Sequence, residues 1–304
     1  MLDRRLAEQV AADLGTDPGL VEKDWHVVRA LGVIAALGHT GIMPVFSGGT
    51  SLSKGWELIR RFSEDIDFKV AMPAAATASR AKSERSTYRR GLLDALMANG
   101  FALEGELLVG NASQFFRADL AYPTVFAAGR GLRPHVRIEM TFHPPRLPPA
   151  VRPIRSLISM LDRTRPAEVE GFPCVDPIET AADKLSALAW RVCSRDRATE
   201  GDDPTVIRHL HDLAALEAHA GSPEAFRRLV RDVAEADGGR GGARVPAALP
   251  ARLVMMLTRL GTDALWKVEY ESFVRQVSFA DAKDMIGYDQ ALAACTRLVA
   301  TVDG

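Results

Sequence analysis

Apolar residues spaced four apart predict two helices in the first 38 residues. In the first, Leu6, Val10 and Leu14 share one face, and Gly15 follows as a stop. In the second, Asp17 can cap the first turn and Pro18 suits it. An apolar stripe then continues along this segment, through Val21, Trp25, Val28, Leu31 and Ile34.

The pattern then changes to short apolar runs that indicate strands. Residues 43–46 are apolar and stop at Gly48-Gly49, so they predict a buried strand that enters a tight turn. A short helix is expected over 50–59 and a longer one over 83–99, with Leu92, Leu93 and Leu96 as core. Four further runs predict strands, at 65–70, 101–109, 113–123 and 135–143.

Prolines from residue 144 to 153 are expected to break regular structure and mark a lobe boundary. We therefore predict one lobe over 1–150 and a mainly helical lobe over 151–304, with the boundary as late as residue 175. Apolar periodicity predicts helices at 177–193, 204–219, 222–237 and 248–276, with a glycine-rich loop at 238–244. The expected fold class is α+β, bilobed, with a small mixed sheet in the first lobe.

Composition is that of an ordinary globular protein. The 304 residues are 47% apolar and 25% charged, and the net charge of −1 does not indicate nucleic acid binding by the whole molecule. Two local clusters of cations form either solvated faces or a basic groove. They are Arg80, Lys82, Arg85, Arg89 and Arg90, and then Arg152, Arg155, Arg163 and Arg165.

Cysteine usage and hydropathy exclude several classes of protein. The three cysteines form no CxxC pair, which argues against a zinc knuckle or a disulfide framework. The N-terminus carries acids and no apolar signal region, and no run of 18 apolar residues occurs. We expect a cytoplasmic protein with no membrane partner.

The segment "DIDF" carries the first candidate chemistry. Side chains alternate along a strand, so Asp65 and Asp67 point one way while Ile66 and Phe68 point into the core. Two adjacent carboxylates repel each other unless a cation lies between them, and Mg²⁺ (or Mn²⁺) prefers such oxygen ligands. The alternative is that both acids simply face water.

The glycine turn before this strand suggests an anion site. Gly48 and Gly49 allow backbone N–H groups to approach a phosphate closely. Hydroxyls that could hold phosphate oxygens follow at Thr50, Ser51 and Ser53, and Lys54 adds positive charge. The segment is not a P-loop, because Ser53 fills the second glycine position and Gly55 follows the lysine.

A third carboxylate is available in the run at 135–143. Glu139 alternates with core positions there, so it joins Asp65 and Asp67 if the two strands are neighbours. Three carboxylates would suit two-metal phosphoryl or nucleotidyl transfer. The alternative is a surface pair of Glu139 with Arg137.

These residues also carry a family resemblance. "GGTSLSK" followed by "RFSEDIDF" resembles the polymerase-beta-like nucleotidyltransferase fold, and more narrowly the AbiEii/MenT family of nucleotidyltransferase toxins. "VEKDW", "DKLSALAWR" and "RHLHDLAAL" are similar to further family segments. The resemblance covers roughly residues 20–216.

The resemblance implies a bilobed nucleotidyltransferase that uses NTP and Mg²⁺ and belongs to a toxin–antitoxin pair. Members of the MenT type add nucleotides to the 3′ end of tRNA. Asp65 and Asp67 match the metal-binding aspartates, Lys184 matches the lysine that meets the triphosphate, and Asp212 matches a fourth essential acid. Glu139 stands where many relatives of the wider superfamily have Asp.

The helical candidates also have ordinary interpretations. Lys184 on a helix could face solvent, or it could neutralise phosphate charge together with Arg191, two turns further on. Asp212 could pair with Arg208 four residues earlier, or orient Arg208 or Lys184 toward a nucleotide.

The predicted function is a toxin that transfers nucleotides from an NTP to the 3′ end of tRNA, with a cognate antitoxin as partner. One alternative is nucleotidyl transfer to a protein side chain or a small molecule. Another is a non-catalytic binding module, although the charge cluster at Asp65, Asp67 and Lys184 argues against it.

Overall fold

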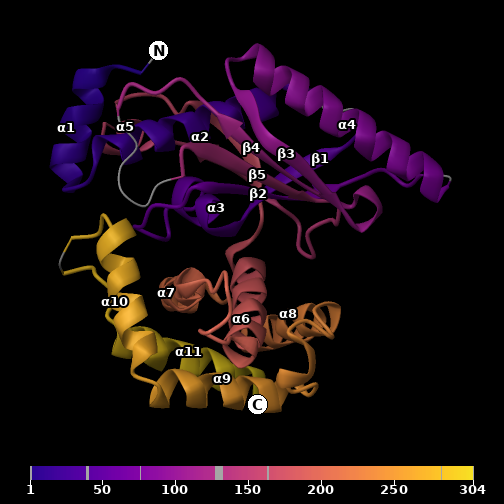
Figure 1. Cartoon of the computed structure of the whole chain (residues 1–304), viewed down its shortest axis with the longest axis vertical. Helices are drawn as coiled ribbons and strands as arrows, with labels where there is room; N and C mark the ends of the chain where they lie inside the picture. The colour runs from indigo at the N-terminus through magenta and orange to yellow at the C-terminus, as the bar shows by residue number, and fades with distance from the viewer. Residues whose placement is uncertain are drawn as a thin grey trace. The chain divides into compact units, whose positions relative to one another are not determined.

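The computed structural model describes residues 2–38, 41–75, 77–126, 133–162, 164–281 and 283–303. These residues form two compact units (Figure 1). Unit 1 comprises Met1–Glu57 and Phe62–Val175, and unit 2 comprises Leu58–Arg61 and Asp176–Gly304. The main boundary between the two units thus follows Val175, the late end of the predicted range. The segment Leu58–Arg61 of the N-terminal half also belongs to unit 2.

Unit 1 is built on a seven-stranded sheet with the order β3-β4-β5-β2-β1-β7-β6. The strands are β1 (Met43–Ser47), β2 (Asp65–Ala71), β3 (Ala102–Gly110), β4 (Phe115–Ala121), β5 (His135–Thr141), β6 (Ala150–Ile154) and β7 (Val169–Cys174). β2 is parallel to β5 and β1 is parallel to β7, whereas the other neighbours are antiparallel. The predicted α+β class with a mixed sheet is confirmed.

The sequence did not predict two of these strands, β6 and β7. The proline-rich segment was expected to lack regular structure, but β6 forms there and pairs with β7. β6 is an edge strand, where a proline lacking its N–H costs no ladder hydrogen bond on the open side. The register of the pair shifts between Arg152 and Ile154, on either side of Pro153.

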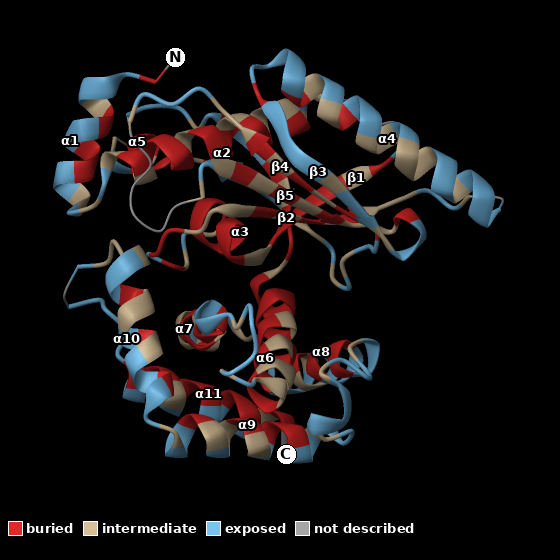
Figure 2. Ribbon diagram, in the orientation of Figure 1, coloured by how far each residue is buried: buried red, intermediate tan, exposed pale blue. Residues whose placement is uncertain are grey.

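Helices cover this sheet and supply its core. They are α1 (Arg4–Leu14), α2 (Pro18–Ala36), α3 (Gly48–Lys54), α4 (Ala78–Ala98) and α5 (Leu157–Leu161). Apolar residues of α2 and α4, such as Leu31 and Leu96, pack with Ile66, Phe68 and Ile138 of the central strands. Figure 2 shows buried residues along most of α2 and exposed residues along α4. α4 starts five residues earlier than predicted because Thr77 caps it, its hydroxyl accepting from Arg80 N.

The burial of α2 includes three consecutive charged residues, 22–24. Each of the three side chains has a hydrogen-bond or ion-pair partner in a different segment of unit 1. The carboxylate of Glu22 accepts from Val125 N at 2.6 Å, and the ammonium of Lys23 binds the carboxylate of Glu64. Because a helix turns about 100° per residue, the three side chains leave α2 in different directions. The "VEKDW" segment thus ties three parts of the chain to one helix.

Asp24 makes the third of these connections. Its carboxylate forms an ion pair with Lys54 and accepts from Leu157 N at 2.6 Å. Asp24 is 1% exposed and Lys54 is 2% exposed. Removing one member of such a pair leaves an uncompensated buried charge, which is strongly destabilising.

We predict that Lys54→Met lowers the free energy of unfolding of unit 1 by about 3–5 kcal/mol, because Asp24 is left buried without its cation. Chemical denaturation measures this change. Lys82→Met, on the exposed part of α4, is the matched control and should change stability by less than about 0.5 kcal/mol. Equal stability of the two variants would contradict the role of the pair.

Unit 2 is helical. Its helices are α6 (Pro177–Ser194), α7 (Arg208–Leu216), α8 (Pro223–Ala236), α9 (Leu249–Thr262), α10 (Leu265–Val277) and α11 (Tyr288–Asp303). The predicted helices at 177–193 and 222–237 are confirmed, and the one at 204–219 is α7 with a 3₁₀ turn at each end. The predicted helix at 248–276 is two helices, because Asp263 is extended and its carboxylate caps α10 by accepting from Leu265 N at 3.0 Å.

The segment Leu58–Arg61 is held within unit 2 by backbone bonds. Arg61 forms an isolated antiparallel β-bridge with Ser278, and Arg60 O accepts from Phe279 N at 3.1 Å. Within the described ranges, neither unit has a helix long and apolar enough to cross a bilayer.

Candidate active site

The carboxylates of β2 and β5 share one face of the sheet. β5 is the parallel neighbour of β2, with Asp67 opposite Glu139 and Asp65 opposite Arg137. Ile66 and Phe68 are buried on the other face, as the alternation predicted. The two strands are therefore neighbours, and Asp65, Asp67 and Glu139 lie on the same face of the sheet.

Arginines partly neutralise this face. Arg133 Nη1 lies 2.5 Å from Asp65 Oδ1. Arg137 binds Asp119 on β4 with two hydrogen bonds of 2.7 and 2.9 Å, so the expected alternative of a pair with Glu139 is wrong. Burial, and then the nearby charge of Asp65, raise the pKa of Glu139.

Gly48 lies directly against Asp67. It has a φ of 72°, which disfavours other residues, and a Cβ placed there would come within 2.2 Å of Asp67 Oδ2. A glycine is thus required for two independent reasons, backbone conformation and space. The close approach places the main chain of the turn beside one of the two β2 carboxylates.

The residues after the glycines face inward. Thr50, Ser51 and Ser53 are at most 1% exposed, and the Thr50 hydroxyl contacts Asp65 O and Ser63 Oγ. Together with the Lys54 ion pair, this placement does not support the predicted contacts of these side chains with phosphate. Thr50 secures the turn against β2, and the main chain at Gly48 and Gly49 is what remains of the predicted anion site.

A divalent cation would find two aspartate donors here. Asp65 and Asp67 offer the carboxylate oxygens that Mg²⁺ prefers, on one face and beside the glycine turn. Among the described residues, no group of three or more His, Cys, Asp or Glu side chains is arranged to hold a metal ion. Asp65 and Asp67 thus fit a cation that takes two of its ligands from these carboxylates and its remaining oxygen ligands from water or a bound substrate.

Unit 2 contains the two other predicted catalytic residues, Lys184 and Asp212, and their side chains are in contact. Lys184 Nζ lies 2.7 Å from Asp212 Oδ2, and the same carboxylate binds Arg61 through two hydrogen bonds of 2.7 and 2.6 Å. Asp212 is 0% and Lys184 7% exposed, so the solvent-facing interpretation of Lys184 is wrong.

Opposing effects set the pKa values in this group. Burial alone would raise the pKa of Asp212, but Arg61 and Lys184 hold it well below its usual range. Burial lowers the pKa of Lys184, while Asp212 raises it and Arg61 lowers it further. The Asp212 carboxylate is therefore held in its ionised form, and His211 Nδ1 lies 3.4 Å from its Oδ1.

Arg191 and Arg208 lie near this group but bind another acid. Arg208 donates to Asp203 at 3.3 Å and to Thr205 at 2.6 Å, and Arg191 lies 3.8 Å from Asp203. The expected pair of Arg208 with Asp212 is wrong, because Asp212 is bound to Arg61 and Lys184. Their role as nucleotide contacts stays a prediction.

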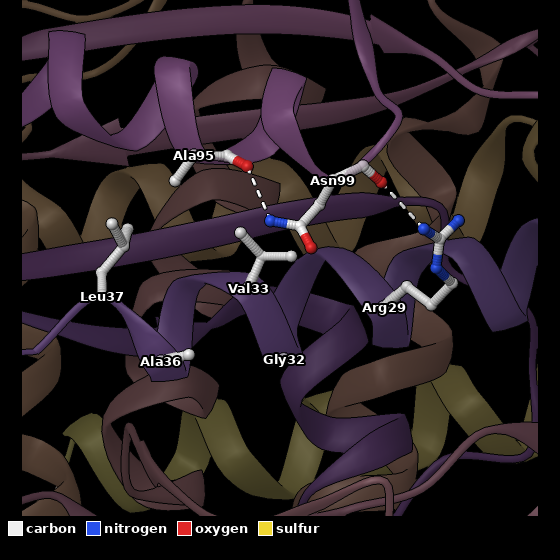
Figure 3. Close-up of a pocket in the computed structure, with 7 residues that line it drawn as sticks. All are labelled: Arg29, Gly32, Val33, Ala36, Leu37, Ala95 and Asn99. Atoms are coloured by element: carbon white, nitrogen blue, oxygen red, sulfur yellow. Dashed lines mark hydrogen bonds between the residues drawn. The ribbon is translucent and has the colours of Figure 1, made fainter.

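Sequence reasoning missed Arg61 and Arg133. Arg61 opens the family segment "RFSEDIDF", but it stands 151 positions before its partner Asp212, so the pair could not be foreseen. A groove of about 440 Å³ between α2 and α4 was also not foreseen (Figure 3). Its lining, which includes Arg29, Val33 and Asn99, contains none of the predicted site residues.

Comparison with known proteins decides the family. The model of the family described as "Nucleotidyl transferase AbiEii toxin, Type IV TA system" matches residues 34–294. The chain belongs to the AbiEii nucleotidyltransferase toxin family. This AbiEii chain is therefore a nucleotidyltransferase and the toxin of a type IV toxin–antitoxin system, with an NTP as substrate and an antitoxin as partner.

A solved structure agrees in fold. MenT4, a nucleotidyltransferase toxin from Mycobacterium tuberculosis H37Rv, is similar to this AbiEii chain with a TM-score of 0.58 and 20% identity, over 99% of each chain. At this identity the likeness shows the fold. No curated protein matches the sequence.

We predict that Gly48→Ala abolishes nucleotidyl transfer, because a Cβ at position 48 would displace the Asp67 carboxylate. The matched control is Gly100→Ala, since Gly100 also has a positive φ, 86°, but no atom within 4 Å of its would-be Cβ. Both variants should lose about 1 kcal/mol of stability from backbone strain. Equal transfer activity in the two variants would show that the contact with Asp67 is unimportant.

Proposed function

We propose that this AbiEii-family toxin uses Mg²⁺ to transfer nucleotides from an NTP to the 3′ end of tRNA. The single observation that carries the proposal is the shared face of Asp65 and Asp67, with Asp67 against the Gly48 main chain. This arrangement offers oxygen donors for a cation next to backbone suited to an anion. A metal-bound triphosphate requires both.

Roles for the individual residues follow from their chemistry. Asp65 and Asp67 would hold Mg²⁺, which when bound supplies charge stabilisation at the phosphates and lowers the pKa of an attacking hydroxyl. Arg133 positions the Asp65 carboxylate. Glu139, opposite Asp67, adds negative charge to the same face and is a candidate third ligand. Lys184 would neutralise phosphate charge.

The choice of tRNA as acceptor rests on the reaction chemistry and on local positive charge. A terminal ribose hydroxyl is a suitable nucleophile toward an α-phosphate. On α4, Arg80, Lys82 and Arg90 are exposed, and Arg80 is paired with Glu84. Arg85 donates to Ala112 O and Arg89 lies over the Phe116 ring. Lys82 and Arg90 are therefore the members of this cluster best placed to meet RNA phosphates.

The second arginine cluster is less available to RNA. Arg152 donates to Gly55 O and lies over the Trp56 ring, and Arg155 donates to Arg165 O. Arg163 lies outside the described residues. We therefore base the RNA proposal on the α4 cluster.

We predict that Asp67→Asn reduces nucleotidyl transfer by about 10³-fold or more, because losing a metal ligand removes roughly 4 kcal/mol of transition-state stabilisation. Steady-state transfer from a labelled NTP measures the change. Asp94→Asn, an exposed aspartate on α4, is the control and should remain fully active. Activity of Asp67→Asn within tenfold of the wild type would remove the β2 carboxylates from the reaction.

The acceptor is tested by labelling total tRNA. We predict that label from an NTP appears at the tRNA 3′ end and that tRNA with an oxidised 3′ ribose accepts none. Replacing both Lys82 and Arg90 by Ala should flatten the salt dependence of tRNA affinity by about 0.7–0.9 in log–log slope per lost phosphate contact. Label on protein alone, or equal labelling of oxidised tRNA, would favour transfer to another acceptor.

A further inference from the structure

We propose that Lys23 and Glu64 are positioning residues of the cation site: they hold the guanidinium of Arg133, which holds one oxygen of Asp65 and leaves the other for the metal. This inference rests on the proposed role of Asp65 as a metal ligand. It assigns a role in the site to the buried lysine of the "VEKDW" segment, which the proposed reaction does not otherwise use.

Four side chains of alternating charge form a continuous chain that ends at the carboxylate of Asp65. Lys23 Nζ binds Glu64 Oε2, and Glu64 Oε1 lies 3.6 Å from Arg133 Nε. Arg133 Nη1 lies 2.5 Å from Asp65 Oδ1. Because the signs alternate, each of these contacts is attractive, and Arg133 lies between two carboxylates. The position of its guanidinium therefore depends on both of them.

Lys23 also holds the main chain of Arg133. Its ammonium donates to Arg133 O at 2.9 Å, in addition to binding Glu64. The Lys23 side chain is 1% exposed, whereas that of Arg133 is 37% exposed. Holding a partly exposed arginine in one rotamer costs conformational entropy. The buried ammonium offsets this cost, because it fixes both the main chain of the arginine and the carboxylate that its guanidinium faces.

A fixed orientation of Asp65 matters because Mg²⁺ demands near-ideal octahedral geometry. Carboxylates that ligate metals are themselves hydrogen-bonded, and losing such an outer partner typically costs about 10- to 100-fold in metal affinity or activity. Arg133 contacts Asp65 through Oδ1, so Oδ2 is the oxygen that remains for the cation. The same carboxylate can therefore serve the arginine and the metal together.

Charge alone predicts the opposite effect of Lys23. An ammonium near a cation site repels the cation, so removing it should tighten metal binding if Coulomb repulsion were all that mattered. A positioning role predicts weaker binding instead. Replacing Lys23 and Glu64 together by neutral residues leaves the net charge unchanged, so charge alone then predicts no change in affinity. The direction of the change in metal affinity thus separates positioning from charge.

The test is direct binding of Mn²⁺ to the full chain without nucleotide or acceptor, followed by electron paramagnetic resonance of the free ion. The variants are Lys23→Met and the double variant Lys23→Met/Glu64→Gln. We expect both to weaken Mn²⁺ affinity by about 10- to 100-fold. The control is Leu96→Ala, which loses stability in the core that contains Ile66 and Phe68 and should bind Mn²⁺ as the wild type does.

Thermal unfolding identifies the variants that fold. If Lys23→Met does not fold, the double variant decides, because replacing both members of a buried pair leaves neither one without its partner. A folded variant of either kind that binds Mn²⁺ within twofold of the wild type, or more tightly, would overturn the inference and leave Lys23 and Glu64 a role in folding alone. An equal loss of affinity in Leu96→Ala would also overturn it. If the wild type binds no Mn²⁺, or if Asp65→Asn binds it as well as the wild type does, the proposed function fails and this inference fails with it.

Discussion

Asp67 packs against the main chain at Gly48, and this contact sets the geometry of the unit 1 site. Because a Cβ at position 48 would come within 2.2 Å of the carboxylate, the turn and β2 can approach this closely only at a glycine. The approach puts backbone suited to an anion beside carboxylates suited to a cation. The Thr50 hydroxyl, bound to Asp65 O, also ties the turn to the strand.

Paired buried charges organise both units. In unit 1, Asp24 and Lys54 form a one-to-one pair, and Glu22 is satisfied by backbone N–H groups. In unit 2, Asp212 has two cations rather than one. In both groups, removing one member would leave a buried charge without its partner, which is strongly destabilising.

The sequence predicted most helices and the central strands because each carries a local pattern. Alternation placed Asp65 and Asp67 correctly opposite the core, and the family segments pointed to Lys184 and Asp212. What it could not predict depends on residues far apart in the chain. β6 lies at an edge and contains a proline, and the Arg61–Asp212 pair joins positions 151 apart. Local reasoning likewise assigned Lys54 to a phosphate, because nothing in its neighbourhood reveals that Asp24 reaches it.

The central claim is that Asp65 and Asp67 hold the divalent cation of nucleotidyl transfer. A crystal structure of the wild-type chain with Mn²⁺ and a non-hydrolysable NTP tests it most directly, since anomalous scattering locates the metal without assumption. The account predicts a peak about 2.1 Å from carboxylate oxygens of both aspartates and from a phosphate oxygen, with octahedral geometry. A bound nucleotide whose metal touches neither aspartate would contradict it.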